Sequence, residues 1–482
     1  MHVHLIGVAG TGMGSFAGLL KAAGHRVTGS DTAFYPPMGE ALAAWGIETL
    51  TGFRPEHLEP APDLVVIGNV CRKDNPEARA AIDRGLAYKS FPKALGEMFL
   101  ATRRSVVVAG THGKTTTSTL GAYLLDAMGL DPSFLVGGIP KNFPESFRLG
   151  TGSAFVVEGD EYDSAFFEKI PKFWSYRPWA AIITSLEHDH VDIYPTMDSY
   201  RDAFRGFVAR MPPDGLLVAN AADVEVVSVC ARAPCRVAYY ALESDRDCTV
   251  TPTWTAAPIA PRAGIQPFEL YVGGTLVGRA MWPAMGEHNV RNATACVALL
   301  AEAFELPGQM LLQKLAGFEG VRRRQELCGT AGGIRVYDDF AHHPTAVDVT
   351  LRAMRAHHPE GRLIAIFEPR SATASRSTHQ ADYPRAFDAA DLTILAPVGR
   401  PEIPAEQRLD VDAIVSAIRA RGHSAQTVAA GAGSVDAIVA AVRDFARAGD
   451  TVAVLSNGAF GGIHAKLLAA LGQIALPPRT HG

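Results

Sequence analysis

The chain has 482 residues, of which 48% are hydrophobic and 20% are charged, an ordinary composition for a protein that folds around buried cores. At roughly 100–200 residues per domain, this length predicts two to four domains. The formal net charge of −5 argues against nucleic acid or an anionic membrane as the main partner.

Neither the cysteines nor the N-terminus indicates export. The six cysteines include no CxxC pair, which favours reduced thiols over a disulfide framework. Residues 1–6 lack the basic and long apolar segments of a signal peptide. The chain contains no apolar run near the roughly 18 residues that a membrane span needs. We therefore expect a cytoplasmic protein with no membrane partner.

The first hundred residues predict a small α/β nucleotide-binding domain. A strand over residues 3–6 leads into a glycine-rich turn, Gly7 to Gly14, and then into an apolar helix. A second strand, residues 26–29, is followed by Asp31, and a third strand covers residues 63–68. This order resembles a dinucleotide-binding unit with altered glycine spacing. Taken alone, the turn would indicate an NAD-linked oxidoreductase.

A second turn carries the clearest functional signal. The apolar strand 105–109 runs directly into Gly110-Thr111-His112-Gly113-Lys114-Thr115 at the start of a predicted helix. Such a turn presents backbone N–H groups to phosphate. Lys114 adds a charge for the terminal phosphates, and the Thr115 hydroxyl suits Mg²⁺. Val108 stands where the usual loop has its first glycine, so this shortened variant disfavours an ordinary GTPase or kinase.

Two further strands of this block end in acidic and histidine side chains. Residues 155–157 lead into Glu158, and residues 181–183 precede the cluster 186–192. An acid at the end of a strand beside a phosphate loop is where Mg²⁺ needs a protein ligand, so we expect Glu158 in that role. His190 is the expected ligand at a second metal position. Without the upstream loop, a solvated acidic turn would be the favoured interpretation of Glu158. The cluster 186–192, taken alone, could be a fragment of a metallohydrolase or a polar loop.

An antiparallel extension is predicted between about residues 236 and 282, where turns and alternating stretches recur. A helix follows from about Asn289 to Phe304. Asn289 is a candidate N-cap of this helix. For Asn292, a structural role and contact with a nucleotide are about equally favoured.

The chain from about residue 318 predicts a third α/β unit with a mostly parallel sheet. Its expected strands are residues 334–337, 363–367, 392–395 and 452–455. The segments 322–324 and 338–344 supply arginines, paired aspartates and paired histidines. A nucleotide held between domains would use an arginine for phosphate and an acid for the ribose hydroxyls. Alternatively, either segment forms a surface ion pair.

The predicted fold is thus α/β in three domains. Residues 1–100 form a Rossmann-like domain. Residues 101–317 form a P-loop ATPase-type α/β domain with the antiparallel extension. Residues 318–482 form a second Rossmann-like domain. Two separate phosphate-binding turns favour two nucleotide-bearing ligands over a single NAD.

Together these motifs resemble the Mur ligase family, ATP-dependent enzymes that add amino acids or peptides to UDP-N-acetylmuramic acid. The resemblance spans essentially the whole chain. It is carried by the N-terminal glycine turn, Gly110 to Thr116, Glu158 to Glu161, Asp189 to Asp192, Gly286 to Ala293 and Asp338 to Pro344.

Two branches of that family use UDP-N-acetylmuramate itself. One adds free L-alanine, and the other reattaches the recycled tripeptide L-Ala-γ-D-Glu-meso-diaminopimelate. Four segments look like the tripeptide branch: residues 35–38, 161–167, 368–371 and 456–464. The resemblance therefore implies a ligase of peptidoglycan recycling, with the L-alanine ligase as the alternative.

The resemblance also implies ATP and Mg²⁺ as cofactors and a role for each motif residue. The expected ATP-binding residues are Gly110, Thr111, His112, Gly113, Lys114, Thr115, Thr116, Asn292, Arg324 and Asp339. The expected UDP-substrate residues are Gly10, Thr11, Gly12, Met13 and Asp31. The expected metal ligands are Thr115, Glu158 and His190. Lys114 is expected to be catalytic, with His188 and His342 as candidates for the general base.

One position departs from the wider family. Several members carry a lysine, carbamylated in use, on the helix after the Asp-His motif, and here Phe204 stands at that place. The muramate-using branches manage without this lysine, so the full ligand set of the second metal stays open. Two rivals from other classes are an NAD-linked oxidoreductase, which leaves the second loop idle, and a non-catalytic P-loop switch, which needs no second carboxylate–histidine cluster.

Overall fold

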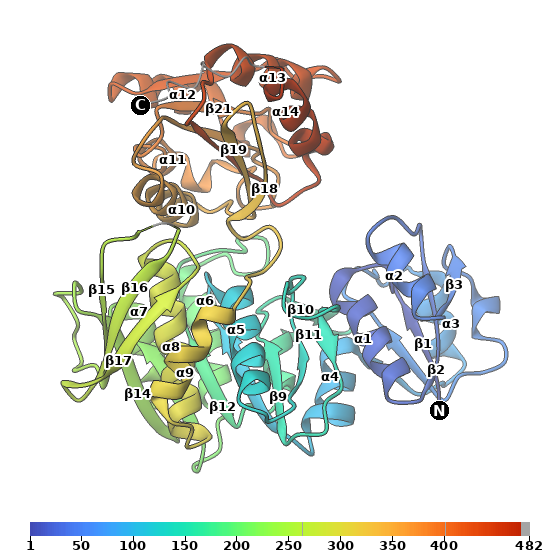
Figure 1. Cartoon of the computed structure of the whole chain (residues 1–482). Helices are drawn as coiled ribbons and strands as arrows, with labels where there is room; N and C mark the ends of the chain where they lie inside the picture. Colours follow the sequence, from blue (N-terminus) through green and yellow to red (C-terminus); the bar gives the residue numbers. More distant parts are fainter. Residues whose placement is uncertain (263, 401, 474–482) are drawn as a thin grey trace.

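The computed structural model describes residues 1–262, 264–400 and 402–473, so residues 474–482 of the predicted third domain lie outside the described part. Three lobes follow one another along the chain, each built on its own main sheet (Figure 1). In that view the N-terminal lobe, in blue, lies beside the central lobe, and the C-terminal lobe, in orange and red, lies above it. Over the described residues, the model contains no helix with the length and apolarity to cross a bilayer.

The N-terminal lobe has a five-stranded sheet in the order β3-β2-β1-β4-β5, and all its pairs are parallel. Its elements are β1 (His2–Ile6), α1 (Thr11–Ala22), β2 (Arg26–Asp31), α2 (Met38–Ala44), β3 (Glu48–Thr51), β4 (Leu64–Ile67), α3 (Pro76–Asp83), β5 (Tyr88–Ser90) and α4 (Phe91–Leu95). The three predicted strands are present as β1, β2 and β4. The sequence analysis missed β3 and β5, which are short and mostly not buried.

The central lobe has a ten-stranded sheet in the order β17-β16-β15-β14-β13-β12-β6-β9-β7-β8. Its strands are β6 (Arg104–Ala109), β7 (Ser133–Leu135), β8 (Phe147–Arg148), β9 (Ala154–Glu158), β12 (Ala180–Ile183), β13 (Leu216–Asn220), β14 (Arg236–Leu242), β15 (Trp254–Pro258), β16 (Gln266–Val272) and β17 (Thr275–Trp282), with a separate hairpin of β10 (Asp163–Ala165) and β11 (Glu168–Pro171). Its helices are α5 (Lys114–Ala127), α6 (Met197–Val208), α7 (Val224–Cys230), α8 (Glu287–Ala303) and α9 (Gly308–Lys314). The parallel strands β6, β9 and β12 end at one edge, which brings their carboxyl-end residues together.

The predicted antiparallel extension is wrong in its first strand. β14 pairs in parallel with both β13 and β15, and antiparallel pairing starts only between β15 and β16. Alternation of side chains marks a strand but not its direction. The direction of β14 follows from helix α7, which carries the chain back across the sheet after β13.

The predicted N-cap of α8 is also wrong. The helix begins at Glu287 with Gly286 as its N-cap, at φ 89°. Asn289 therefore lies inside the first turn, where its side-chain amide donates to Met285 O at 2.9 Å and to Gln325 Oε1 at 3.1 Å. Gly286 tolerates the positive φ that the N-cap position has here. The N-cap can therefore lie three residues before the predicted cap, Asn289.

The C-terminal lobe has a six-stranded sheet in the order β18-β19-β23-β20-β21-β22, parallel except for the β18–β19 pair. Its strands are β18 (Glu326–Ala331), β19 (Ile334–Asp339), β20 (Leu363–Phe367), β21 (Leu392–Leu395), β22 (Ser424–Thr427) and β23 (Thr451–Leu455). Its helices are α10 (Pro344–His357), α11 (Tyr383–Ala386), α12 (Val411–Ala420), α13 (Ser434–Phe445) and α14 (Ile463–Leu471). The predicted mostly parallel sheet, and the α/β class of the whole chain, are confirmed.

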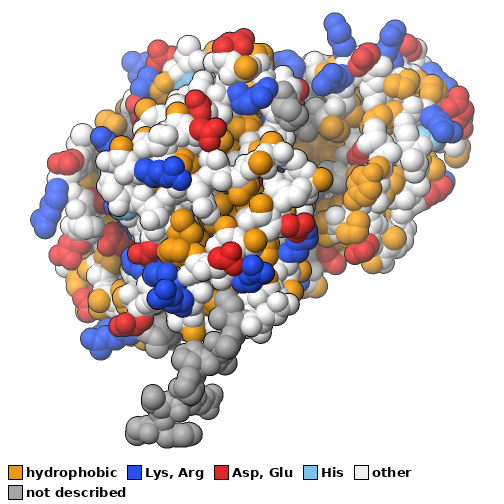
Figure 2. All heavy atoms as spheres, turned by 90° about the horizontal axis from the view of Figure 1, so that it is seen from above, with side chains coloured by type: hydrophobic (Ala, Val, Ile, Leu, Met, Phe, Trp, Pro, Cys, Tyr) orange, Lys and Arg blue, Asp and Glu red, His pale blue; other side chains and the backbone are white. Residues whose placement is uncertain are grey.

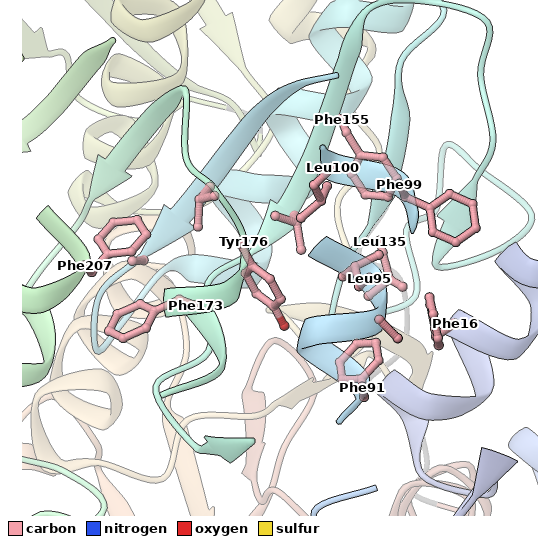
Figure 3. Packing of buried hydrophobic residues seen from close by; sticks show 14 of the residues in the cluster. Phe16, Phe91, Leu95, Phe99, Leu100, Leu135, Phe155, Phe173, Tyr176 and Phe207 are labelled. Atoms are coloured by element: carbon pink, nitrogen blue, oxygen red, sulfur yellow. The ribbon is translucent and has the colours of Figure 1, made fainter. Parts of the chain in front are cut away.

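A continuous apolar core joins the N-terminal and central lobes. Phe16 on α1 lies with its ring centroid 5.3 Å from Phe91 and 6.0 Å from Phe99, and Phe99 in turn contacts Phe155 on β9 (Figure 3). The carboxyl-terminal lobe has separate clusters of buried side chains. On the face seen from above, basic and acidic side chains are interspersed (Figure 2).

Candidate active site

A cavity of about 1320 Å³ lies between the central and C-terminal lobes. The central lobe lines it with the phosphate loop and with residues that follow β9 and β12. The C-terminal lobe contributes the end of β19 and the start of α10. Among the residues that line this cavity are Thr111, His112, Gly113, Lys114, Thr115, Thr116, Glu158, Glu187, Asp189, His190, Asn292, Arg324, Asp339, His342 and His343.

The phosphate loop forms as predicted between β6 and α5. Gly113 precedes the helix with φ 80°, a left-handed conformation that favours glycine. A Cβ at this position would lie 2.6 Å from Asn292 Oδ1, so a side chain would collide with α8. The close approach of α8 explains why Asn292, far away in the sequence, reaches the loop.

Lys114 pairs with Glu161, an acid that was not predicted as a site residue. Its Nζ donates to both oxygens of Glu161, at 3.1 and 3.0 Å, and to Gly110 O at 2.6 Å. Burial acts to lower the pKa of Lys114, but Glu161 and its acidic neighbours outweigh burial and raise the pKa. The lysine is therefore charged and already held at the loop.

Glu161 is almost fully buried, and several groups hold its charge in place. His190 Nε2 lies 3.2 Å from Glu161 Oε1, and the Tyr200 hydroxyl donates to the same oxygen at 3.0 Å. Burial alone would raise the pKa of Glu161, yet Lys114 and His190 lower it to about 2. In return, Glu161 outweighs the burial of His190 and raises the pKa of that ring.

The predicted metal ligands Thr115 and Glu158 lie side by side at the loop. The Thr115 hydroxyl donates to Glu158 Oε1 at 2.9 Å, and Gly137 N donates to Glu158 Oε2 at 2.8 Å. A hydroxyl next to a carboxylate, both on the cavity wall, is a donor set that Mg²⁺ prefers. Arg324, from the chain segment before β18, reaches the same hydroxyl at 3.2 Å. His190 lies at Glu161 rather than at this pair.

The candidate general bases lie in different surroundings. His188 Nε2 lies 2.8 Å from Tyr194 O and is not among the described residues that line the cavity. His342 lines the cavity with Nδ1 3.0 Å from Phe340 O. Burial outweighs that hydrogen bond and lowers the pKa of His342, so its ring is neutral at neutral pH. The geometry thus favours His342 over His188.

Glu187 links the phosphate loop to the C-terminal lobe. Its Oε2 accepts from the Thr345 hydroxyl at 2.6 Å and lies 3.3 Å from His112 Nε2 and 3.4 Å from His343 Nδ1. Asp189 makes a second link through a hydrogen bond with Thr373. Since Thr345, His343 and Thr373 belong to the other lobe, these acids tie the two lobes together.

Asp339 sits at the end of β19 and faces the cavity. Its carboxylate accepts backbone N–H bonds from Gln325 at 2.7 Å and from Ala341 at 2.8 Å. Burial raises the pKa of Asp339, and the nearby Arg324 opposes this only in part.

The residues predicted for the UDP substrate lie apart from this cavity, in the N-terminal lobe. Gly10 is the N-cap of α1, so Thr11, Gly12 and Met13 form its first turn. Asp31 Oδ2 accepts from Ala9 N at 2.9 Å, which fastens the end of β2 to the glycine turn. A helix N-terminus after a glycine turn offers free N–H groups to a phosphate.

Phe204 is a core residue. Its side chain is fully buried on α6, with ring centroids 5.2 Å from both Phe173 and Tyr200. One turn earlier on the same helix, the Tyr200 hydroxyl reaches Glu161 and also lies 3.2 Å from Thr111 Oγ1. In this chain α6 therefore contributes a tyrosine hydroxyl near the loop.

Five residues that the structure brings to this site were not predicted from the sequence: Glu161, Glu187, Asp189, Tyr200 and His343. Glu161 lies in the same acidic motif as the predicted ligand Glu158, and Glu187 lies in the same cluster as the predicted ligand His190. Tyr200 lies 39 residues from Glu161 along the chain, and Thr345 lies 158 residues from Glu187. No local pattern marks Tyr200, because a tyrosine on a helix is most often part of the core.

Three family models match successive parts of the chain. Residues 2–103 match the Mur ligase family, catalytic domain. Residues 108–300 match the Mur ligase middle domain. Residues 323–458 match the Mur ligase, glutamate ligase domain.

Individual proteins of this kind align over most of the chain. The UDP-N-acetylmuramate–L-alanyl-γ-D-glutamyl-meso-2,6-diaminoheptandioate ligase of Escherichia coli K12 is 36% identical over 476 residues, which cover 98% of this chain and 99% of that protein. The UDP-N-acetylmuramate–L-alanine ligase of Kineococcus radiotolerans is 37% identical over 404 residues, covering 82% and 81%.

Solved structures agree. The crystal structure of a murein peptide ligase from Psychrobacter arcticus is 35% identical, with a TM-score of 0.71 and coverage of 99% of this chain and 100% of that one. The three family models, the aligned relatives and the loop geometry lead to the same assignment: the chain belongs to the Mur ligase family of ATP-dependent ligases.

Proposed function

We propose that this ligase joins UDP-N-acetylmuramate to L-Ala-γ-D-Glu-meso-diaminopimelate, with conversion of ATP to ADP and phosphate, in peptidoglycan recycling. The proposal rests on how much of the chain aligns with each relative. The relative that uses this tripeptide aligns over 98% of the chain, whereas the L-alanine ligase aligns over 82% at nearly the same identity. The proposed dependence on ATP supports a cytoplasmic location for the reaction.

Each lobe takes one part of the reaction in this proposal. The N-terminal lobe, residues 1–100, holds the UDP pyrophosphate at the glycine turn, with Gly10, Thr11, Gly12, Met13 and Asp31. The central lobe, residues 101–317, holds ATP at the phosphate loop. The C-terminal lobe, residues 318–473 of the described chain, closes over the nucleotide and receives the peptide. The mixed charge of the protein suits small-molecule partners and not nucleic acid.

The reaction proceeds in two displacements. The lactyl carboxylate of UDP-N-acetylmuramate attacks the γ-phosphorus of ATP, and the bond from that phosphorus to the β,γ-bridging oxygen breaks, which gives an acyl phosphate and ADP. The amine of the tripeptide then attacks the activated carbonyl carbon, the amide bond forms, and inorganic phosphate leaves. Phosphorylation is needed because a free carboxylate has a poor leaving group.

The residues of the loop neutralise and position the phosphates. Lys114 and the N–H groups at the start of α5 face the negative charge. Thr115 and Glu158 would hold Mg²⁺, with His190 as the ligand proposed for a second ion, and the metal would supply charge neutralisation. Arg324, from the C-terminal side, reaches the loop in this arrangement of the lobes. The two lobes would therefore complete the site together and exclude water from it.

The incoming amine has to lose a proton as the amide forms. We assign His342 as the acceptor, because it lines the cavity as a neutral ring. A neutral imidazole is the form that accepts protons at neutral pH.

The deciding experiment is an ADP-release assay with UDP-N-acetylmuramate, ATP and Mg²⁺, run separately with the tripeptide and with free L-alanine. We expect turnover with the tripeptide at least tenfold faster than with L-alanine. Preference for L-alanine would move the protein to the other branch. Turnover with neither substrate would overturn the proposal.

A further inference from the structure

Three potential metal ligands from two lobes converge on one point of the cavity. His112 belongs to the phosphate loop, Glu187 follows β12, and His343 is the N-cap of α10 in the C-terminal lobe. Each offers one ligand atom, and the three atoms lie within 4.8 Å of one another. Glu187 Oε2 is the centre of the group, 3.3 Å from His112 Nε2 and 3.4 Å from His343 Nδ1.

These spacings are close to those of a tetrahedral metal site. With bonds of roughly 2.0–2.1 Å, ligand atoms around a tetrahedral ion lie about 3.4 Å apart. The two distances from Glu187 already have this value. The remaining histidine–histidine separation, at most 4.8 Å, would have to shorten by no more than about 1.4 Å.

The chemistry of the three groups points to one class of ion. Two imidazole nitrogens and one carboxylate oxygen suit a borderline divalent cation such as Zn²⁺ or Co²⁺. Mg²⁺ and Ca²⁺ prefer oxygen ligands alone. The acid–hydroxyl pair of Glu158 and Thr115 therefore suits Mg²⁺, and the histidine cluster suits a different ion.

The His343 ring is poorly satisfied by the protein itself. Its Nδ1 accepts only a long hydrogen bond of 3.4 Å from Thr345 N. Its Nε2 is buried and has no hydrogen-bond partner among the described residues. The atom that faces Glu187 is Nδ1, so a cation bound there would replace the long hydrogen bond from Thr345 N with a stronger interaction.

We propose that His112, Glu187 and His343 bind one divalent cation of the Zn²⁺ class, with water completing its coordination. The ion joins the phosphate loop of the central lobe to the first turn of α10 in the C-terminal lobe. It thereby fastens the two lobes in the arrangement seen here. This site is separate from the Thr115–Glu158 pair, and its existence does not depend on which peptide the enzyme uses.

The test is a Zn²⁺ titration of the nucleotide-free full-length protein by calorimetry, with Co²⁺ absorption as a second readout. We expect one equivalent of Zn²⁺ to bind and to raise the Tm, and we expect Co²⁺ to give the visible spectrum of a tetrahedral ion. A tenfold excess of Mg²⁺ should displace neither ion. A Co²⁺ spectrum typical of an octahedral ion, or displacement by Mg²⁺, would overturn the proposal.

Two variants locate the bound ion. His343→Asn keeps a side chain that can cap α10, and Glu187→Gln keeps the size of the acid. Each should weaken Zn²⁺ binding at least tenfold, whereas the matched control His25→Asn, in the N-terminal lobe, should bind as the wild type does. Unchanged affinity in either site variant would overturn the proposal. If His343→Asn fails to fold, Glu187→Gln decides the question alone.

Discussion

Lys114 Nζ lies 3.0 Å from Glu161 Oε2, and the Glu161 side chain is only 1% exposed. The ammonium that we assign to the terminal phosphates of ATP is thus already paired with a buried acid. The pair keeps the lysine charged and aimed at the loop before any nucleotide arrives. We therefore expect Lys114 to have a catalytic role and Glu161 a structural role.

Lys114→Met should abolish most activity and also destabilise the protein. Loss of one positioned charge costs about 10²–10³-fold in turnover in comparable sites. Removing one partner of a buried ion pair costs about 3–5 kcal/mol of unfolding free energy. The double variant Lys114→Met/Glu161→Gln should regain stability in urea unfolding while ADP release stays low. Phosphate release by Lys114→Met at the wild-type rate would contradict the assignment of Lys114.

Glu161 should make the protein sensitive to acid in a defined window. Its pKa is lowered from 4.5 to about 2 in the folded protein. A lowered pKa stabilises the fold fully above the unfolded value, and that contribution disappears as the pH falls from about 4.5 towards 2.

Urea unfolding at several pH values between 7 and 3 measures this effect. Glu161→Gln should be less stable than the wild type at pH 7 and should lose less stability on acidification. Glu360→Gln, a change at an exposed residue, should keep the full acid sensitivity. An identical slope in Glu161→Gln and the wild type would show that this carboxyl does not titrate with folding.

Glu158→Gln should weaken the response to Mg²⁺. The glutamine keeps the size of the side chain but removes the charge that a hard cation needs beside the Thr115 hydroxyl. We expect ADP release to require at least tenfold more Mg²⁺ for half-maximal rate. Glu406→Gln, at an exposed position, is the control. A Mg²⁺ curve that is the same for Glu158→Gln and the wild type would rule out Glu158 as a ligand.

Phe204→Lys should not restore the lysine found in other family members. The site is fully buried between the rings of Phe173 and Tyr200, so a charged side chain would lose its hydration without a partner. We expect a loss of about 3–5 kcal/mol in unfolding free energy and no gain in turnover. Phe204→Leu should cost less than half of that. A stable, more active Phe204→Lys protein would show that α6 can supply a metal ligand.

Local patterns predicted most of the fold. The strands that lead into the two glycine turns were found because apolar runs followed by glycine have few other solutions. The direction of β14 was missed because it depends on helix α7, which carries the chain back to the starting edge of the sheet after β13. Asn289 was misplaced as a cap because Gly286 starts the helix earlier.

The site divides in the same way. Lys114, Thr115 and Glu158 follow directly from strand ends and a helix start, and the structure brings all three to one cavity wall. Glu161 and Glu187 gained their importance from partners in distant parts of the chain. Burial also separated His342, which lines the cavity, from His188, which bonds to Tyr194 O nearby in the sequence.

Three features of the chain could be recognised from the order of its residues: a phosphate loop, acids at strand ends and a second glycine turn. These are properties of short segments, where neighbouring residues set the backbone conformation. Which polar groups come into contact depends on the tertiary structure, as for Glu187 and Thr345 from two different lobes. Hydrogen bonding, burial and electrostatic coupling depend on distance in space. For residues far apart along the chain, that distance is set by the packing of the segments that carry them.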